Sequence, residues 1–138
     1  MTLLIANRGE IALRIIRTAT ELGMQTVAVY AEDDADSPHV HAAGEAIGLP
    51  GTGPDAYLDQ TAMLAAAKRS GAEMIHPGYG FLSENAEFAR ACAAAGYAFV
   101  GPDGDVLERV GNKSSARAAA IAAGVPVLPA TDGPSSVD

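Results

Sequence analysis

Cysteine and positive charge are both scarce in this sequence. Cys92 is the only cysteine among 138 residues, which excludes an internal disulfide and a multi-cysteine metal site and favours a reducing compartment. Lys and Arg number 9 against 17 Asp and Glu, and the formal net charge is −8. Nucleic acids and anionic membranes are bound through clustered Lys and Arg, so neither is expected as a partner. Cys92 lies in an alanine-rich stretch that offers no general base, which predicts a buried small side chain and not a nucleophile.

Long apolar runs are also missing. The N-terminal run covers only Leu3 to Ala6, too short for a signal peptide or a membrane-spanning helix, and we expect a cytoplasmic protein. Hydrophobic residues nevertheless make up 49% of the chain and charged residues 19%, which is typical of a globular protein. The length suits a single domain with its own hydrophobic core.

Short apolar segments alternate with helical patterns along most of the chain. Strands are predicted at 3–6, 25–31, 45–49, 72–75 and 97–101, and helices at 10–22, 58–71, 83–96, 103–112 and 113–124. Strands that are separated by helices of about a dozen residues form a parallel sheet with helices on its faces. The sequence therefore predicts a three-layer, Rossmann-like α/β fold with about five parallel strands.

The turn after the first predicted strand is where a dinucleotide-binding fold would have its glycine motif. Such a site needs G-x-G-x-x-G, so that a pyrophosphate can approach the start of the helix. Only Gly9 is present in ANRGEIA, which excludes a nicotinamide or flavin site here. Asn7 precedes Glu10 by three residues, a spacing that predicts a capping box with Asn7 as the cap. His39 and His41 lack a third ligand nearby, so a solvated surface pair is favoured over a metal site.

Four charged residues of the first predicted helix lie on one face. Glu10, Arg14, Arg17 and Glu21 follow each other at spacings of four, three and four residues. This pattern is typical of an exposed face with two ion pairs, and it also suits a charged contact between subunits. Composition alone favours the exposed face.

The stretch HPGYGFLSEN, at 76–85, concentrates special residues in one βα connection. Gly78 and Gly80 permit a positive φ or a close backbone approach, Tyr79 is held out between them, and Ser83 is predicted to cap the next helix. Ligands of parallel sheets bind beyond the carboxyl ends of the strands. The stretch is therefore either an ordinary loop or the wall of a site, and the residues alone leave both open.

Lys113 occupies an unfavourable position. Asn112 is predicted to cap the last helix, which puts Lys113 in the first turn, where a cation opposes the helix dipole by about 0.3–1 kcal/mol. A bound phosphate would remove the conflict, but an exposed lysine that tolerates a small penalty is an equally good explanation. Further on, the apolar run 125–128 predicts the first strand of another unit.

Several motifs occur in the order and spacing of biotin carboxylase. They include IANRGEIA at 5–12, HPGYGFLSEN at 76–85, FVGP at 99–102, GNKSSAR at 111–117 and AGVPVLP at 123–129. The chain thus resembles the N-terminal, pre-ATP-grasp domain of that family over residues 1–124, with 125–138 as the start of, or linker to, an ATP-grasp domain. The family is the ATP-dependent ligase component of acetyl-CoA carboxylase, which serves fatty acid biosynthesis, and of propionyl-CoA and pyruvate carboxylases.

The resemblance implies an enzyme that uses MgATP and bicarbonate to carboxylate biotin on a carrier protein or domain, from which a carboxyltransferase passes the carboxyl group on. It implies that Lys113 contacts ATP phosphates and that Tyr79 and Gly80 border the bicarbonate and biotin pocket. Asn112 stands where many relatives have aspartate, which puts only the fine positioning of Lys113 in doubt.

The same resemblance assigns a second role to the first helix. Arg14, Arg17 and Glu21 match a helix of the family's homodimer contact, which reverses the preference for a merely exposed face. The phosphate lid, the metal-binding glutamates and the catalytic arginine of the family belong to later domains. No catalytic residue and no metal ligand is therefore expected here, and the 138 residues alone are expected not to turn over ATP.

Two other interpretations stay open. A naturally short interaction or dimerisation module without catalysis would show a native product of 14.0 kDa. A relative of the carbamoyl phosphate synthase large chain would need an ammonia route and a second ATP-grasp half. The sequence does not identify the final acceptor of the carboxyl group, because that choice lies in the carboxyltransferase.

Overall fold

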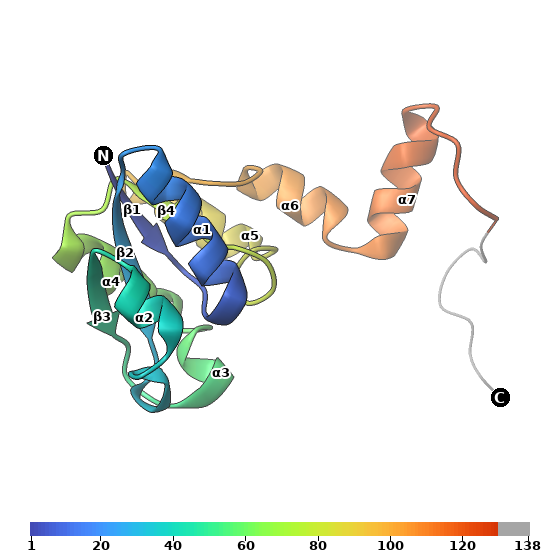
Figure 1. The fold of residues 1–138 in the computed structure, drawn as a ribbon. Helices are drawn as coiled ribbons and strands as arrows, with labels where there is room; N and C mark the ends of the chain where they lie inside the picture. Colours follow the sequence, from blue (N-terminus) through green and yellow to red (C-terminus); the bar gives the residue numbers. More distant parts are fainter. Residues whose placement is uncertain (130–138) are drawn as a thin grey trace, which may run out of the picture.

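The computed structural model describes residues 1–129, in which strands and helices alternate (Figure 1). In chain order the elements are β1 (Thr2–Ile5), α1 (Gly9–Glu21), β2 (Gln25–Tyr30), the 3₁₀ turn η1 (Glu32–Asp34), α2 (Pro38–Ala42), β3 (Glu45–Gly48), α3 (Gly53–Ala56), α4 (Gln60–Ser70), β4 (Met74–His76), α5 (Ala86–Ala94), β5 (Ala98–Phe99), α6 (Gly104–Val110) and α7 (Lys113–Ala122). The five predicted strands of the sheet and the five predicted helices are all present. None of their ends differs from the predicted one by more than three residues.

The five strands form one parallel sheet in the order β3-β2-β1-β4-β5. The chain leaves the central strand β1 toward β2 and β3 on one side, and then returns to β4 and β5 on the other. Leu4 of β1 lies opposite Val27 of β2 and Ile75 of β4. This order is the Rossmann-like arrangement, so the predicted three-layer α/β fold is confirmed.

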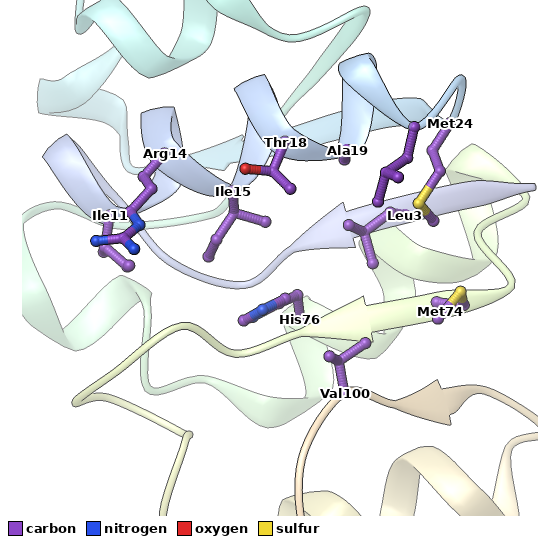
Figure 2. Close-up of a pocket in the computed structure, with 11 residues that line it drawn as sticks. Leu3, Ile11, Arg14, Ile15, Thr18, Ala19, Met24, Met74, His76 and Val100 are labelled. Atoms are coloured by element: carbon purple, nitrogen blue, oxygen red, sulfur yellow. The ribbon is translucent and has the colours of Figure 1, made fainter.

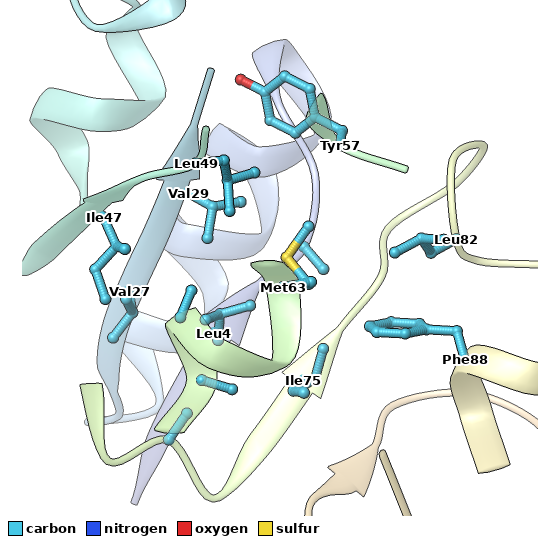
Figure 3. Close-up of a cluster of buried hydrophobic side chains, with 14 of the residues drawn as sticks. Leu4, Val27, Val29, Ile47, Leu49, Tyr57, Met63, Ile75, Leu82 and Phe88 are labelled. Atoms are coloured by element: carbon cyan, nitrogen blue, oxygen red, sulfur yellow. The ribbon is translucent and has the colours of Figure 1, made fainter. Parts of the chain in front are cut away.

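One face of the sheet carries the larger core (Figure 3). Leu4, Val27 and Ile75 point from this face toward Met63 of α4 and Phe88 of α5, and all five side chains are buried. Side chains alternate across a strand, so the neighbours of these residues face the other way. Apolar residues on both faces of each central strand explain why β1 and β2 are continuous hydrophobic runs.

The opposite face is covered by α1. Its buried residues recur with helical spacing, and Ala12, Ile15 and Ile16 pack against Leu3 and Ile5 of β1. Helix α2 contacts both α1 and β2 beside them. The burial of 24 apolar side chains in the two clusters between these layers fixes where the strand ends lie, and it thereby positions the loops that follow them.

Two predicted helix caps are wrong. Asn7 does not cap α1, because the N-cap position is Arg8 and no side chain bonds to the helix there. Asn85, and not Ser83, caps α5 by accepting a hydrogen bond from the backbone of Phe88 at 2.8 Å. Phe88 is fully buried, so its packing fixes where the helix begins.

His39 and His41 are not a solvated surface pair. His41 is exposed, but His39 is fully buried because the short helix α2 packs on β2. Its Nε2 lies 3.2 Å from the carbonyl oxygen of Val29, and its Nδ1 has no hydrogen-bond partner among the described residues. Burial lowers the pKa of His39, partly offset by the Val29 carbonyl and by Asp34, so the ring is neutral in the folded protein.

The last two helices differ in how they contact the rest of the domain. Arg90 of α5 pairs with Asp105 and Glu108 of α6, and a Cβ on Gly104 would lie 2.8 Å from the carbonyl oxygen of Ala86, so α6 packs tightly on α5. Helix α7 contacts α6, has no buried residue and stands away from the sheet (Figure 1).

The strand predicted at 125–128 is not formed, and residues 125–129 have no regular structure. A strand needs a hydrogen-bonded partner, and the described residues provide none for this run. The interpretation of 125–138 as the start of, or linker to, an ATP-grasp domain stays a prediction, and 130–138 lie outside the described residues.

Candidate functional site

The order of the strands marks one place where a ligand site is expected. Between β1 and β4 the direction of the chain across the sheet reverses, and the loops that follow these two strands separate at that point. In open parallel sheets, ligands bind in the crevice outside the carboxyl ends of the strands at such a switch point. The loops concerned are residues 6–8 and 77–85, which belong to the two most distinctive sequence motifs.

Asn7 joins these two loops. Its side chain is 1% exposed, and Nδ2 donates to the carbonyl oxygens of Pro77 at 2.6 Å and Tyr79 at 2.8 Å. Its Oδ1 accepts a hydrogen bond from the backbone N–H of Arg8 at 2.9 Å. The carboxamide that was expected to cap a helix is therefore used to bind the loop that follows the neighbouring strand.

A second contact joins the same loops at the surface. The hydroxyl of Tyr79 donates to Oε1 of Glu10, in the first turn of α1, at 2.6 Å. This hydrogen bond raises the pKa of Tyr79, so the phenol stays protonated. Tyr79 is 60% exposed, which agrees with the prediction that it is held out between two glycines.

The two glycines have different surroundings. Both have a φ of +66°. A Cβ at Gly78 would lie 2.6 Å from Nδ2 of Asn7, whereas a Cβ at Gly80 would meet nothing within 4 Å. Gly78 is therefore packed on the asparagine, and there is open space beside Gly80. His76 supports the turn, because its Nδ1 accepts from the N–H of Gly78 at 3.0 Å and burial lowers its pKa.

A further polar network borders the site on the β2 side, and sequence reasoning missed it. Two nitrogens of Arg8 contact the carboxylate of Asp34 at 2.9 and 3.0 Å, and Tyr57 donates to the same carboxylate at 2.8 Å. Burial opposes ionisation of Asp34, but the hydrogen bonds from Tyr57 and Ser37 and the charge of Arg8 outweigh it, so the pKa is lowered. Asp34 belongs to the acidic run 32–34 after β2, and nothing in that run indicates Arg8 as its partner.

Comparison with known proteins agrees with this geometry. A model of the family described as biotin carboxylase, N-terminal domain, matches residues 1–107. Biotin carboxylase of Halalkalibacterium halodurans is 56% identical over 131 residues, which are 94% of this chain and 29% of that protein. The chain belongs to the biotin carboxylase N-terminal domain family.

Two solved structures extend the comparison. A single-chain, multi-domain long-chain acyl-CoA carboxylase is 76% identical with a TM-score of 0.93, and the match covers 99% of this chain and 14% of that one. The biotin carboxylase domain dimer of the 2-oxoglutarate carboxylase of Hydrogenobacter thermophilus, in complex with MgADP, ADP and bicarbonate, is 46% identical with a TM-score of 0.88, over 96% of this chain and 29% of that one. The chain spans less than a third of the length of each of these three proteins.

In this biotin carboxylase N-terminal domain, Lys113 is not brought beside Tyr79 and Gly80. Lys113 is exposed and is the first residue of α7, the helix that stands away from the sheet (Figure 1). The predicted cap is confirmed, since Asn112 accepts from the backbone of Ser114 at 2.9 Å and of Ser115 at 3.2 Å.

The charged stripe of α1 is exposed, as its spacing predicts. The two predicted ion pairs are wrong, because within residues 1–129 neither Glu10 with Arg14 nor Arg17 with Glu21 comes within 4.0 Å. Glu10 is used by Tyr79 instead. Arg14, Arg17 and Glu21 are exposed on one side of α1.

An apolar groove of about 450 Å³ lies beside this stripe, on the α1 face of the sheet (Figure 2). Figure 2 shows α1 on one side of the groove and Met74, His76 and Val100 on the other. Arg14 is the one charged side chain that lines it. No carboxylate lines the groove, and its other polar residues are Thr18 and His76, of which His76 directly precedes the loop 77–85.

The described residues fit only part of the cofactor set of the family. Within residues 1–129, no three His, Cys, Asp or Glu side chains come together as a metal site, so Mg²⁺ would need ligands from elsewhere. The open space beside Gly80 and the exposed ring of Tyr79 are compatible with a small ligand at the loop. Cys92 is buried, as predicted, and burial raises the pKa of its thiol to about 11. None of the described helices is long and apolar enough to cross a membrane.

Proposed function

We propose that this chain is the N-terminal part of a complete biotin carboxylase, which uses MgATP and bicarbonate to carboxylate biotin on a carrier protein or domain. A carboxyltransferase then delivers the carboxyl group to an acceptor that these residues do not choose. The observation that carries the proposal is the meeting of the ANRGE and HPGYG motifs at the switch point of the sheet. A cytoplasmic location belongs to the same proposal.

Tyr79 and Gly80 form a wall of the bicarbonate and biotin pocket in this proposal. Support comes from the backbone at Gly80, where space is open to a ligand, and from Tyr79, whose ring is fixed by Glu10 while most of it stays exposed. Both residues follow the carboxyl end of β4, where ligands of parallel sheets bind.

Lys113 contacts phosphate oxygens of ATP. The support for this contact is electrostatic, since Lys113 is exposed at the N-terminus of the ten-residue helix α7, where the positive end of the helix dipole also favours an anion. When bound, MgATP would provide the phosphoryl group that activates bicarbonate. The Mg²⁺ ligands come from later parts of the polypeptide. The 138 residues alone therefore do not turn over ATP.

The role of Lys113 is tested in the complete enzyme with free biotin as the substrate. We expect Lys113→Ala to lower kcat/KM for ATP at least about tenfold, because a charge-assisted contact to phosphate is lost. Lys68, the other lysine of the chain, is exposed at the end of α4 and provides the control Lys68→Ala. Equal ATP kinetics in the two variants would refute the assignment.

Arg14, Arg17 and Glu21 contact a second copy of the enzyme. Their exposure on one side of α1 and the dimer of the Hydrogenobacter thermophilus domain support this proposal. Reversing one charge with Arg17→Glu should weaken the dimer of the complete enzyme at least about tenfold in sedimentation, because like charges then face each other. Arg69→Glu, on α4, is the control, and an unchanged dimer in Arg17→Glu would exclude the contact.

A further inference from the structure

We infer that Asn7 is the positioning residue of the loop that carries Tyr79 and Gly80, and that it sets the geometry of this wall for bicarbonate and biotin. The inference rests on the proposed function for the role of the wall itself. Asn7 was expected to cap a helix, and nothing else in the sequence pointed to the contacts that it makes.

The hydrogen bonds of Asn7 leave little freedom to the loop. Both N–H bonds of the carboxamide are used, one by the carbonyl of Pro77 and one by the carbonyl of Tyr79, and Oδ1 is used by the backbone of Arg8. The two acceptors flank Gly78, so three consecutive residues of the loop are fixed from one buried side chain. The backbone on each side is anchored by the sheet, because Ala6 donates to His76 at 2.9 Å.

Neither aspartate nor alanine satisfies this arrangement. An aspartate at position 7 would bring a carboxylate against two carbonyl oxygens, and an alanine would leave both carbonyls without this donor. Gly78 completes the fit, because any side chain there would collide with Nδ2 of Asn7. The asparagine of one motif and the first loop glycine of the other are therefore two halves of one contact.

The experiment uses the complete enzyme and compares Asn7→Asp with Tyr79→Ala and with Thr26→Val. Thr26 is a matched control, since its buried hydroxyl accepts one hydrogen bond, from Gly44 at 3.1 Å, at the opposite end of β2 from the site. We expect Asn7→Asp to raise KM for bicarbonate and biotin about 10- to 100-fold, because binding groups that lose the contacts holding them in place lose affinity by about this factor. KM for ATP should stay unchanged within about twofold. Thr26→Val should leave all three KM values unchanged.

The pH dependence separates positioning from general damage. Burial against two carbonyl oxygens raises the pKa of the carboxyl group in Asn7→Asp, and its protonated form regains one donor. The ratio of variant to wild-type KM for bicarbonate should therefore fall as the pH is lowered toward 6. A ratio independent of pH would contradict the inference.

The two proposals fail in different ways. If Tyr79→Ala impairs the use of bicarbonate and biotin while Asn7→Asp behaves like Thr26→Val, the positioning role of Asn7 is wrong and the proposed pocket stands. If neither Tyr79→Ala nor Asn7→Asp changes these kinetics, the pocket itself is misplaced.

Discussion

The body of the domain and helix α7 differ in how their positions are fixed. Up to Leu107, helices and strands bury two apolar clusters on the two faces of the sheet. Beyond Leu107 no described residue is buried, and α7 contacts its neighbour α6 and, through Arg117, the carbonyl of Leu128. The family match ends at the same residue, 107.

This difference has a consequence for the two proposed parts of the site. The loop with Tyr79 and Gly80 is fixed by contacts within the body, so its geometry is present before any ligand binds. Lys113 is fixed only relative to α7. The proposed wall for bicarbonate and biotin is therefore preorganised by this domain, whereas the proposed contact of Lys113 with phosphate depends on what α7 packs against.

Truncation of the core should produce the largest difference between the two regions. Leu4→Ala empties a fully buried position in the central strand and should lower the free energy of unfolding by about 2–5 kcal/mol. Ile121→Ala removes a half-exposed side chain of α7 and should change it by less than about 0.5 kcal/mol. Urea denaturation followed by circular dichroism measures both, and similar losses would show that α7 belongs to the cooperative unit.

Acid should weaken the body through His39. Burial puts its folded-state pKa below the unfolded value of 6.5, so the unfolded state binds more protons, and stability is lost as the pH falls through 6.5 toward the folded pKa. The slope is at most about 1.4 kcal/mol per pH unit for one histidine. His76 acts in the same direction.

The matched variants for this prediction are His39→Gln and His41→Gln. Urea midpoints between pH 7.5 and 5.5 should depend less on pH in His39→Gln than in the wild type. His41 is exposed, so His41→Gln should retain the full dependence. Identical pH dependence in all three proteins would mean that the buried ring does not contribute.

The sequence predicts the layers of this fold well because periodicity reports burial directly. Leu4 and Val27 lie in short apolar runs, and Ile15 and Ile16 recur with helical spacing, so strands and long helices were recognisable. Helices α2 and α3 have five and four residues, too few for a period to appear. The burial of His39 followed from α2 and was missed for the same reason.

The site was predicted only in part, because local spacing does not report contacts between distant segments. The interval between Asn7 and Glu10 has the pattern of a capping box, but both side chains are bound by a loop some seventy residues away. The pairing of Arg8 with Asp34 likewise depends on how β1 and β2 lie side by side. Motif resemblance located these loops, and only the strand order explains why they meet.

The smallest effect is expected from two helix caps that are chemically alike. Asn85 accepts from the backbone of Phe88 in α5, and Asn112 accepts from the backbone of Ser114 in α7. Replacing either by alanine costs about 0.5–2 kcal/mol of helix stability. Because α5 is part of the core, Asn85→Ala should lower global stability in urea by that amount, whereas Asn112→Ala should speed hydrogen exchange within α7 and leave the urea midpoint unchanged. An equal shift of the midpoint in both variants would mean that α7 unfolds together with the body, and Lys113 would then be as firmly placed as the loop of Tyr79 and Gly80.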